Sequence, residues 1–333
     1  MKCFITGVTG FIGQNLARQL ATDGHAVNAI LRNTVSPDWK DIPGIQFFNG
    51  DLDNINALKG AMKGCDVVFH LAALAKPWSK DPGDFHRVNV QGAVNVFTAA
   101  LEAGVKKVVF TSSAATMSPS TDHKPADEST PRVIPYFNAY ETTKEEAEQR
   151  AREFCAMGLP VVIVNPTRVY GPGPLNASNS LTKMIAGYQK GTWRIIPGDG
   201  RKIGNYVYID DVVHGHILAA QKGRAGERYI LGGENITFDE LFQTLDRVTG
   251  VHRRMIHLPV GVMTITAKFM EWQNNITGIP PAITAGFLKK YMNHWSLSCD
   301  KAIGELDYSI TPFAVGVKRT LEWLETSGEL VIK

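Results

Sequence analysis

Thr6-Gly7-Val8-Thr9-Gly10-Phe11-Ile12-Gly13 is the stretch of sequence on which the fold assignment depends. It follows a short apolar run, Lys2–Thr6, which predicts a β-strand, and it leads into a run of helical periodicity, Phe11–Ala21. A glycine-rich turn between a strand and a helix leaves N–H groups at the helix start free to bind a pyrophosphate. The stretch therefore predicts a dinucleotide-binding turn with contacts from Gly7, Thr9, Gly10, Phe11, Ile12 and Gly13. A structural turn without a ligand stays open as the alternative.

Strand-like and helix-like blocks alternate through the first half of the chain. The strand-like blocks are Ala26–Leu31, Ile45–Asn49, Asp66–Leu71, Val108–Thr111 and Val161–Val164. This alternation predicts an α/β fold, in which a doubly wound Rossmann sheet of parallel strands carries helices on both faces. We expect residues 1–166 to form the NAD(P)-binding core and residues 167–333 a small C-terminal α/β substrate lobe, interleaved with the last Rossmann elements. In the lobe, Thr237 and Glu240 predict a capped helix over Asp239–Val248.

Tyr140 and Lys144 lie four residues apart in a segment expected to be helical, with Asn138 as its N-cap and Glu141 completing a capping box. The two side chains therefore share one helix face. A free tyrosine has a pKa of about 10, so it transfers protons poorly at neutral pH unless a cation favours its phenolate. We expect Lys144 to be that cation and to reach a ribose hydroxyl. Taken alone, the pair also fits a solvated helix face.

Ser113 ends the run Lys107–Ser113, an apolar strand that breaks into hydroxyl side chains at its carboxyl end. In an open parallel sheet, ligands bind outside the carboxyl ends of the strands. A hydroxyl there can hydrogen-bond a substrate oxygen and stabilise the charge that develops on it. We expect this role for Ser113, whereas Ser112 is expected to satisfy the turn.

Composition narrows the function classes. The chain has 333 residues, 44% of them apolar, and a net charge of +3 without any Lys/Arg run, so no nucleic acid partner is expected. Its four cysteines lack metal-ligand spacing, and we expect reduced thiols, no metal site and a cytoplasmic protein. The first strand begins at once, which leaves no room for a signal peptide. The apolar run Pro259–Met270, cut by Lys268, is too short to span a membrane but could lie on one.

The end of the second expected strand bears on the choice of cofactor. An acidic residue there would bind the ribose 2′-hydroxyl of NAD, whereas an arginine accommodates the 2′-phosphate of NADP. This chain has Arg32 at that position. NADP(H) is therefore favoured and NAD(H) stays open, since Arg32 can also be a surface arginine that stacks on adenine.

Together these motifs resemble the extended short-chain dehydrogenase/reductase family, whose marks are TGxxGxxG, a catalytic Ser or Thr, and YxxxK. The resemblance covers nearly the whole chain and implies a Rossmann fold, a nicotinamide cofactor and a homodimer. Three segments resemble cofactor-contacting segments of the family. Gly50–Leu52 resembles the one that contacts adenine, His70–Ala73 the one under the nicotinamide ribose, and Asn165–Pro172 the loop that contacts the carboxamide. Beyond the glycine turn and Arg32, the expected cofactor contacts are Asp51, Leu52, Leu71, Ala72, Ala73, Thr111, Tyr140, Lys144, Pro166, Thr167 and Val169.

Two departures from the family's sugar-nucleotide epimerases concern the substrate. Those enzymes usually have Asn where this chain has Arg168 and often Arg where it has Gly204, and both residues hold the substrate diphosphate. Leu231–Asn235 instead resembles the dihydroflavonol-reductase-like and 3β-hydroxysteroid-dehydrogenase-like branch. Arg168 or Arg201 would restore the charge, which keeps a sugar nucleotide open. We expect a small-molecule substrate in contact with Trp78, Met117, Arg168 and Tyr170.

The sequence thus predicts an NADP(H)-dependent oxidoreductase that reduces a ketone or aldehyde, or oxidises the alcohol. Tyr140 would protonate the carbonyl oxygen, Ser113 would hydrogen-bond it, and Lys144 would lower the tyrosine pKa. An NAD-dependent nucleotide-sugar epimerase or dehydratase is the first alternative, and a non-catalytic dinucleotide-binding regulator is the second. Val262–Met292 is interpreted either as an apolar lid over the pocket or as core packing.

Overall fold

A computed structural model describes residues 1–32, 42–76, 78–121, 124–279, 281 and 284–330. Its main element is a seven-stranded sheet in the order β10-β6-β5-β4-β1-β2-β3, with every neighbouring pair parallel. The strands are β1 (Lys2–Thr6), β2 (Ala26–Leu31), β3 (Ile45–Asn49), β4 (Val67–His70), β5 (Lys107–Thr111), β6 (Val161–Pro166) and β10 (Arg228–Leu231). The predicted doubly wound Rossmann sheet is confirmed.

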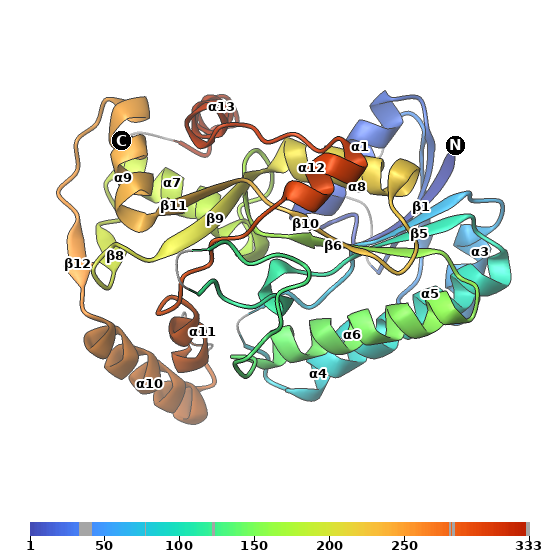
Figure 1. Cartoon of the computed structure of the whole chain (residues 1–333), viewed down its shortest axis with the longest axis horizontal. Helices are drawn as coiled ribbons and strands as arrows, with labels where there is room; N and C mark the ends of the chain where they lie inside the picture. The colour runs from blue at the N-terminus through green and yellow to red at the C-terminus, as the bar shows by residue number, and fades with distance from the viewer. Residues whose placement is uncertain (33–41, 77, 122–123, 280, 282–283, 331–333) are drawn as a thin grey trace.

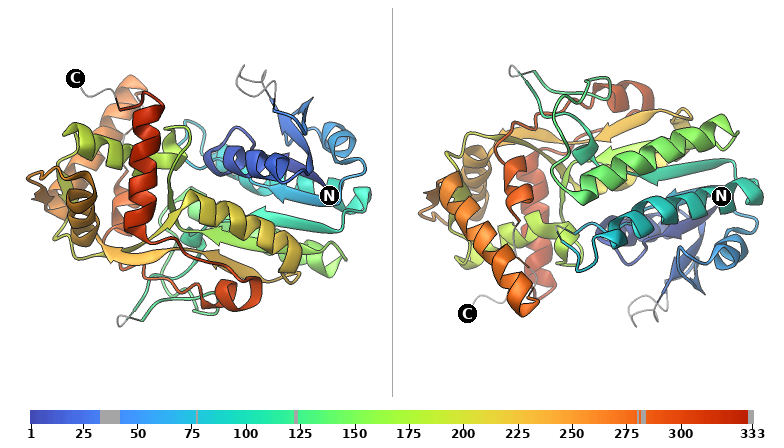
Figure 2. Two further views of the ribbon diagram at one scale, coloured as in Figure 1. Left: turned by 90° about the horizontal axis from the view of Figure 1, so that it is seen from above. Right: turned by 90° about the horizontal axis from the view of Figure 1, so that it is seen from below.

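Helices cover both faces of this sheet, as the two views of Figure 2 show. One face carries α1 (Phe11–Thr22), α8 (Ile209–Lys222) and α12 (Asp300–Leu306). The other face carries α3 (Ile55–Met62), α5 (Gly92–Ala103) and α6 (Ala139–Ala156), while α4 (Gly83–His86) and the π-helical turn η1 (Arg87–Gln91) lead into α5. Because side chains alternate along a strand, Val108 and Phe110 of β5 pack into the core on the α5 face, and Val109 packs into the core on the α8 face.

The second lobe stands at the carboxyl ends of the strands (Figure 1). It contains the three-stranded sheet β11-β9-β7 and the parallel pair β12-β8. Its strands are β7 (Arg168–Tyr170), β8 (Ile195–Pro197), β9 (Ile203–Tyr208), β11 (Glu234–Thr237) and β12 (Ile256–Leu258). Its helices are α7 (Ser180–Lys190), α9 (Phe238–Thr249), α10 (Val260–Thr277), α11 (Ala285–Lys290) and α13 (Phe313–Thr326), and short 3₁₀ turns lie at η2 (Ala114–Thr116) and η3 (Ala177–Asn179).

The chain crosses between the two regions more than once. After β7, α7, β8 and β9 it returns to the Rossmann sheet through α8 and β10, and it then leaves again for β11. The division into a cofactor-binding core (1–166) and a substrate lobe (167–333) therefore stays a prediction. The seven-stranded sheet contains strands from both parts, since β10 belongs to the second.

Helix α9 begins with the expected cap. The Thr237 hydroxyl accepts a hydrogen bond from the Glu240 N–H at 3.1 Å, and the Glu240 carboxylate accepts one from the Thr237 N–H at 2.7 Å. This reciprocal pair satisfies two backbone donors that a helix start otherwise leaves open. It also fixes the first residue of the helix, Phe238, whose ring lies against the Arg168 guanidinium.

We predict that Thr237→Ala lowers the free energy of unfolding by about 1 kcal/mol, because the N-cap acceptor is lost. Thr326→Ala is the matched control, since the Thr326 hydroxyl bonds back to the Glu322 and Trp323 carbonyls within α13 and caps no helix start. Urea unfolding of both variants measures the difference. Equal losses in the two variants would contradict a capping role for Thr237.

Candidate active site

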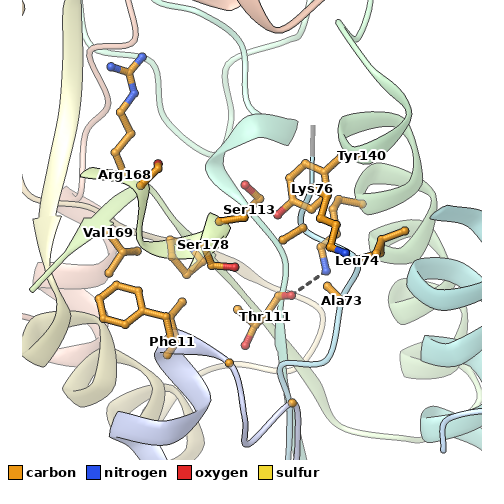
Figure 3. A pocket seen from close by; sticks show the side chains of 18 of the residues that line it. Phe11, Ala73, Leu74, Lys76, Thr111, Ser113, Tyr140, Arg168, Val169 and Ser178 are labelled. Atoms are coloured by element: carbon orange, nitrogen blue, oxygen red, sulfur yellow. Dashed lines mark hydrogen bonds between the residues drawn. The ribbon is translucent and has the colours of Figure 1, made fainter. Parts of the chain in front are cut away.

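A cleft of about 1270 Å³ opens at the carboxyl ends of β1, β4, β5 and β6, between the sheet and the second lobe. Parallel sheets bind ligands at this edge, where the strand order reverses between β1 and β4. Figure 3 shows Phe11 at the start of α1 on one side of the cleft and Tyr140 on the other. All of the predicted cofactor contacts line the cleft: Gly7, Thr9, Gly10, Phe11, Ile12, Gly13, Arg32, Asp51, Leu52, Leu71, Ala72, Ala73, Thr111, Tyr140, Lys144, Pro166, Thr167 and Val169.

The glycine turn is shaped for close approach of a ligand. Gly7 has a φ of +75°, and a Cβ on it would stand 2.6 Å from the Ala72 nitrogen. A Cβ on Gly13 would stand 2.2 Å from the Gly7 carbonyl oxygen. Gly10 is the N-cap of α1 and supplies no side chain to cap it, so the helix start offers its N–H groups to the cleft. These donors fit the pyrophosphate of a dinucleotide.

Ser113 follows the last residue of β5 and begins the turn η2. Its hydroxyl accepts a hydrogen bond from the Ala115 N–H at 3.2 Å, and its proximity lowers the pKa of the Tyr140 phenol. The neighbouring Ser112 points elsewhere, since its hydroxyl donates to the buried Glu148 carboxylate at 2.5 Å. The two adjacent serines therefore have different surroundings, and Ser113 is the one beside Tyr140.

Tyr140 and Lys144 lie one turn apart on α6. Asn138 caps this helix by accepting from the Glu141 N–H at 2.9 Å, as expected. The Glu141 carboxylate differs from the expected capping box, because it accepts from the Phe137 N–H at 3.0 Å and pairs with Arg132 instead. The cap fixes the first turn of α6 and directs Tyr140 into the cleft (Figure 3).

Lys144 is fully buried, with a side chain that reaches the end of β5. Its Nζ donates to the Thr111 carbonyl at 2.8 Å and stands 4.4 Å from the centre of the Phe110 ring. Burial lowers the pKa of Lys144 to about 7, against the opposing attraction of the Glu148 carboxylate. The ammonium is therefore held near its titration point at neutral pH.

The pKa of the Tyr140 phenol lies above its ordinary value in this structure, and the lowering expected from Lys144 stays a prediction. Burial raises the pKa of the Tyr140 phenol, while the contact with Ser113 lowers it and the Glu141 carboxylate adds to the rise. The Lys144 Nζ is held by the Thr111 carbonyl. Ser113 is thus the side chain that favours the phenolate here.

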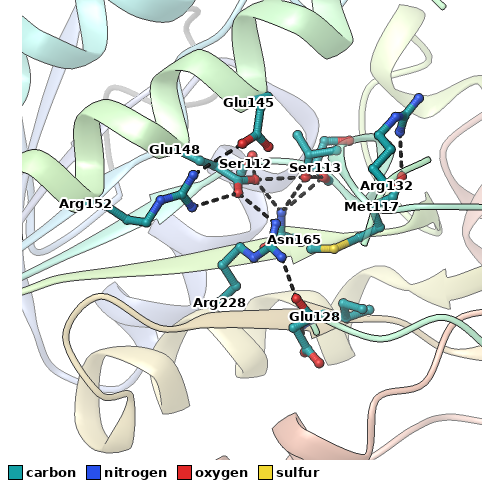
Figure 4. Close-up of polar contacts among 12 residues, drawn as sticks. Ser112, Ser113, Met117, Glu128, Arg132, Glu145, Glu148, Arg152, Asn165 and Arg228 are labelled. Carbon is teal, nitrogen blue, oxygen red and sulfur yellow. Dashed lines mark hydrogen bonds and ion pairs between the residues drawn. The ribbon is translucent and has the colours of Figure 1, made fainter. Parts of the chain in front are cut away.

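A buried carboxylate holds these elements together (Figure 4). Glu148, on the turn of α6 after Lys144, is 0% exposed and accepts hydrogen bonds from Ser112, from Thr116 at 2.9 Å and from Asn165 at 2.8 Å. Arg228 of β10 approaches the same carboxylate at 3.4 Å. The contacts tie α6 to the carboxyl ends of β5 and β6, where Ser113 and Lys144 stand.

On the lobe side, Arg168 lines the cleft within a cage of aromatic rings. Its guanidinium carbon lies 5.3, 5.7 and 5.4 Å from the ring centres of Tyr206, Phe238 and Tyr291, and its Nη1 donates to the Tyr206 hydroxyl at 3.0 Å. Gly204 leaves the room for it, because a Cβ there would stand 2.5 Å from Arg168 Nη1. The Arg168 guanidinium thus occupies the space that a side chain at residue 204 would need.

The other three expected substrate contacts do not line the cleft. Met117 is 2% exposed in the core, and Trp78 lies half-buried outside the lining. Tyr170 is 0% exposed, because α13 packs directly on it: its hydroxyl donates to the Phe313 carbonyl at 3.1 Å, and Gly316 leaves space for the ring. Of the four, only Arg168 lies where a substrate could reach it.

Sequence reasoning missed residues from the C-terminal half that complete the cleft wall. They are distant from the recognisable motifs and reach the cleft only through the packing of the lobe. The segment Val262–Met292 gave the only signal. From it, Met263 and Thr266 of α10, Lys290 of α11 and Tyr291 line the cleft, together with Trp193 and Ile195 near β8.

Comparison with known proteins agrees with this geometry. The model of the NAD dependent epimerase/dehydratase family matches residues 3–232. A protein of Synechocystis sp., provisionally named dihydroflavonol 4-reductase, is 31% identical over 98% of this chain and 95% of its own length. A 4-hydroxy-2-methyl-3-oxo-4-farnesyl-3,4-dihydroquinoline-1-oxide ketoreductase of Stigmatella aurantiaca is 29% identical over 93% of this chain and 92% of its own. The Bos taurus sterol-4-alpha-carboxylate 3-dehydrogenase, decarboxylating, is 32% identical over 72% of this chain and 65% of its own.

Two solved structures are similar over the whole chain. The crystal structure of gox2253 has a TM-score of 0.83 and 33% identity and covers 98% of this chain and 99% of its own. DesIV, a dTDP-glucose 4,6-dehydratase of Streptomyces venezuelae solved with NAD and TYD bound, has a TM-score of 0.79 and 25% identity and covers 99% and 98%.

We predict that Lys144 makes the stability of the protein depend on pH. The pKa of Lys144 is about 7 in the folded chain and 10.5 in a free lysine, so between these values the unfolded chain binds the additional proton. The cost of burying the charge is full below pH 7 and is relieved as the pH rises toward 10.5. Relative to Lys144→Met, the wild type should gain stability over this range with a slope that approaches about 1.4 kcal/mol per pH unit.

Chemical unfolding of both proteins at pH 7, 8 and 9 would measure this difference. Comparison with Lys144→Met cancels the titration of the other buried groups, such as Cys3 and Cys299, which burial shifts in both proteins. Parallel stability curves for the two proteins would contradict a depressed pKa for Lys144.

Proposed function

The chain belongs to the NAD dependent epimerase/dehydratase family, and from this premise we propose that it is an NADP(H)-dependent oxidoreductase that reduces a ketone or aldehyde, or oxidises the corresponding alcohol. The observation that carries the proposal is the meeting of Ser113, Tyr140 and Lys144 in the cleft that the glycine turn also lines. The relatives named as a ketoreductase and as a 3-dehydrogenase support a carbonyl and alcohol pair as the reacting groups. The expected homodimer and cytoplasmic location remain predictions.

A nicotinamide dinucleotide, when bound, supplies or accepts the hydride. The turn from Gly7 to Gly13 would hold its pyrophosphate through backbone N–H groups, because the glycines leave no side chain in the way. Lys144 of α6, whose Nζ lies at the end of β5, would bind its ribose. Arg32 lines the cleft at the end of β2, and there it would pair with a 2′-phosphate.

The residues divide the proton chemistry as follows. In the reducing direction Tyr140 Oη gives its proton to the carbonyl oxygen, and the Ser113 hydroxyl donates a hydrogen bond to that oxygen. The tyrosinate left behind is favoured by Ser113, and we expect the protonated Lys144 ammonium to favour it as well. Solvent then returns a proton to Tyr140 Oη. In the oxidising direction the same atoms act in reverse order.

The second candidate is a nucleotide-sugar epimerase or dehydratase, and Arg168 is the observation that favours it. A guanidinium in the cleft wall could hold a diphosphate, since Gly204 leaves it room and the described residues place no carboxylate against it. Redox stoichiometry separates the two functions, because an epimerase consumes no cofactor in a complete turnover. Stoichiometric loss of NADPH with substrate supports the reductase, and turnover without net loss supports the epimerase.

We predict that Tyr140→Phe removes nearly all turnover and leaves NADPH binding within a few fold, because only the proton-transfer group is lost. Tyr136→Phe is the matched control. Tyr136 lies four residues before Tyr140, and it does not line the cleft. Rates and cofactor titrations on the same preparations test this. Substantial turnover by Tyr140→Phe would exclude the assigned role, and lost cofactor binding would mean wider damage to the site.

A separate prediction concerns the choice of cofactor. NADPH should bind more tightly than NADH, and Arg32→Asp should reverse this order by about 1–3 kcal/mol, because an attraction to the 2′-phosphate becomes a repulsion. Fluorescence titration with both reduced cofactors measures it. Arg254→Asp, an exposed arginine outside the cleft lining, controls for the change in net charge. Equal affinities in the wild type, unchanged in Arg32→Asp, would refute the assignment.

A further inference from the structure

Large apolar side chains stand in water along one face of α10, which forms the outer edge of the second lobe in Figure 1. Val262, Ile265, Phe269, Trp272 and Ile276 are 49%, 72%, 58%, 57% and 65% exposed. Their spacing alternates between three and four residues, so they form one continuous stripe along the helix. Ile279, just beyond the end of α10, extends the stripe and is 58% exposed.

The opposite face of α10 already packs on the protein. Ala267 is 0% exposed and Met263 lines the cleft, while the exposed Thr266 stands between this face and the stripe and also lines the cleft. The outer stripe is therefore not needed to attach the helix. Scattered exposed apolar residues are ordinary on a soluble protein, but a contiguous row of this length marks a surface that binds an apolar partner.

The charged side chains of the segment that carries the stripe are mostly positive. Val260–Met292 contains three lysines and one glutamate. Lys268 and Lys289 are exposed, and the part of the chain that the structure describes places no carboxylate within ion-pair distance of either. The single acid, Glu271, is half-buried and accepts from the Ala285 N–H at 2.9 Å. An apolar row with an exposed lysine on the same helix and another on the following helix is complementary to the interface of an anionic lipid bilayer.

We propose that the outer stripe of α10 docks on the surface of an anionic lipid bilayer, with the helix lying in the plane of the interface. Aromatic side chains favour this depth in a bilayer, and the Phe269 and Trp272 rings are adjacent, with centres 5.6 Å apart. Among the described residues, no helix has the length and apolar character that a membrane span requires.

Docking would bring the cleft to the membrane. Met263 and Thr266 belong to the same helix as the stripe and line the cleft, so the docked helix would stand between the lipid and the cleft. This inference concerns binding alone, and it holds or fails whether or not the proposed reaction is correct.

A second copy of the chain fits the stripe less well. A symmetric pair through α10 would set the same residues against each other and bring the Lys268 side chains of two copies to one interface. Like charges at an interface oppose association, whereas phosphate headgroups attract them. The charge beside the stripe therefore favours lipid as the occupant.

Vesicle sedimentation tests the proposal. Wild-type protein should sediment with vesicles of phosphatidylcholine mixed with phosphatidylglycerol, less with phosphatidylcholine alone, and less again as salt is added. Phe269→Glu with Trp272→Glu should reduce binding to the mixed vesicles by about tenfold or more, because charge replaces the inserted rings. Lys268→Glu with Lys289→Glu should remove the preference for the mixed vesicles.

The matched control is Ile303→Glu with Val315→Glu, two side chains 43% and 42% exposed on α12 and α13, and it should bind like the wild type. NADPH titration of every variant checks that the cleft remains folded. Failure of the wild type to bind the mixed vesicles, or binding by Phe269→Glu with Trp272→Glu equal to that of the control, would overturn the proposal. A wild-type dimer that only the stripe variant dissociates would assign the stripe to a second copy instead.

Discussion

The buried carboxylate of Glu148 is the constraint on which the cleft depends. A carboxylate without access to water must be surrounded by donors, and here they come from Ser112, Thr116 and Asn165, with Arg228 nearby. These donors belong to separate elements, so satisfying the charge also fixes α6 against the ends of β5 and β6. Removing a partner from a buried charge of this kind costs about 3–5 kcal/mol, which keeps the arrangement in one register.

The charge state of Lys144 depends on this fixed arrangement around Glu148. Its ammonium is buried one helical turn before Glu148, and burial alone would expel the charge. The nearby carboxylate and the Thr111 carbonyl offset that cost in part, so the lysine stays close to the midpoint between its charged and neutral forms. The Glu148 carboxylate thus helps to keep part of the buried Lys144 side chain charged at neutral pH.

The strands and the cofactor contacts could be predicted from the sequence because short local motifs determine them. The bounds of β2 and β3 match the predicted blocks, and β4 is shorter than predicted by a residue at each end. Every predicted cofactor contact lines the cleft because each belongs to a short segment at a strand end. Tyr170 and Met117 failed to reach it since the packing of α13 and of the core decides their positions, and Tyr291 was missed because only the folded lobe brings it there. The direction of the Lys144 side chain was equally a matter of tertiary contacts.

The fit of Arg168 into the space left by Gly204 has a consequence for how such clefts can diverge. Any side chain at residue 204 would collide with the guanidinium, while a short side chain at residue 168 would leave a hole among three aromatic rings. The two positions are in direct contact, so we expect the energetic effects of substitutions at residues 168 and 204 to be non-additive. A lineage that enlarges residue 204 would have to move both the Arg168 guanidinium and the Tyr206 ring, so we expect substitutions at this wall to be accepted in combination rather than singly.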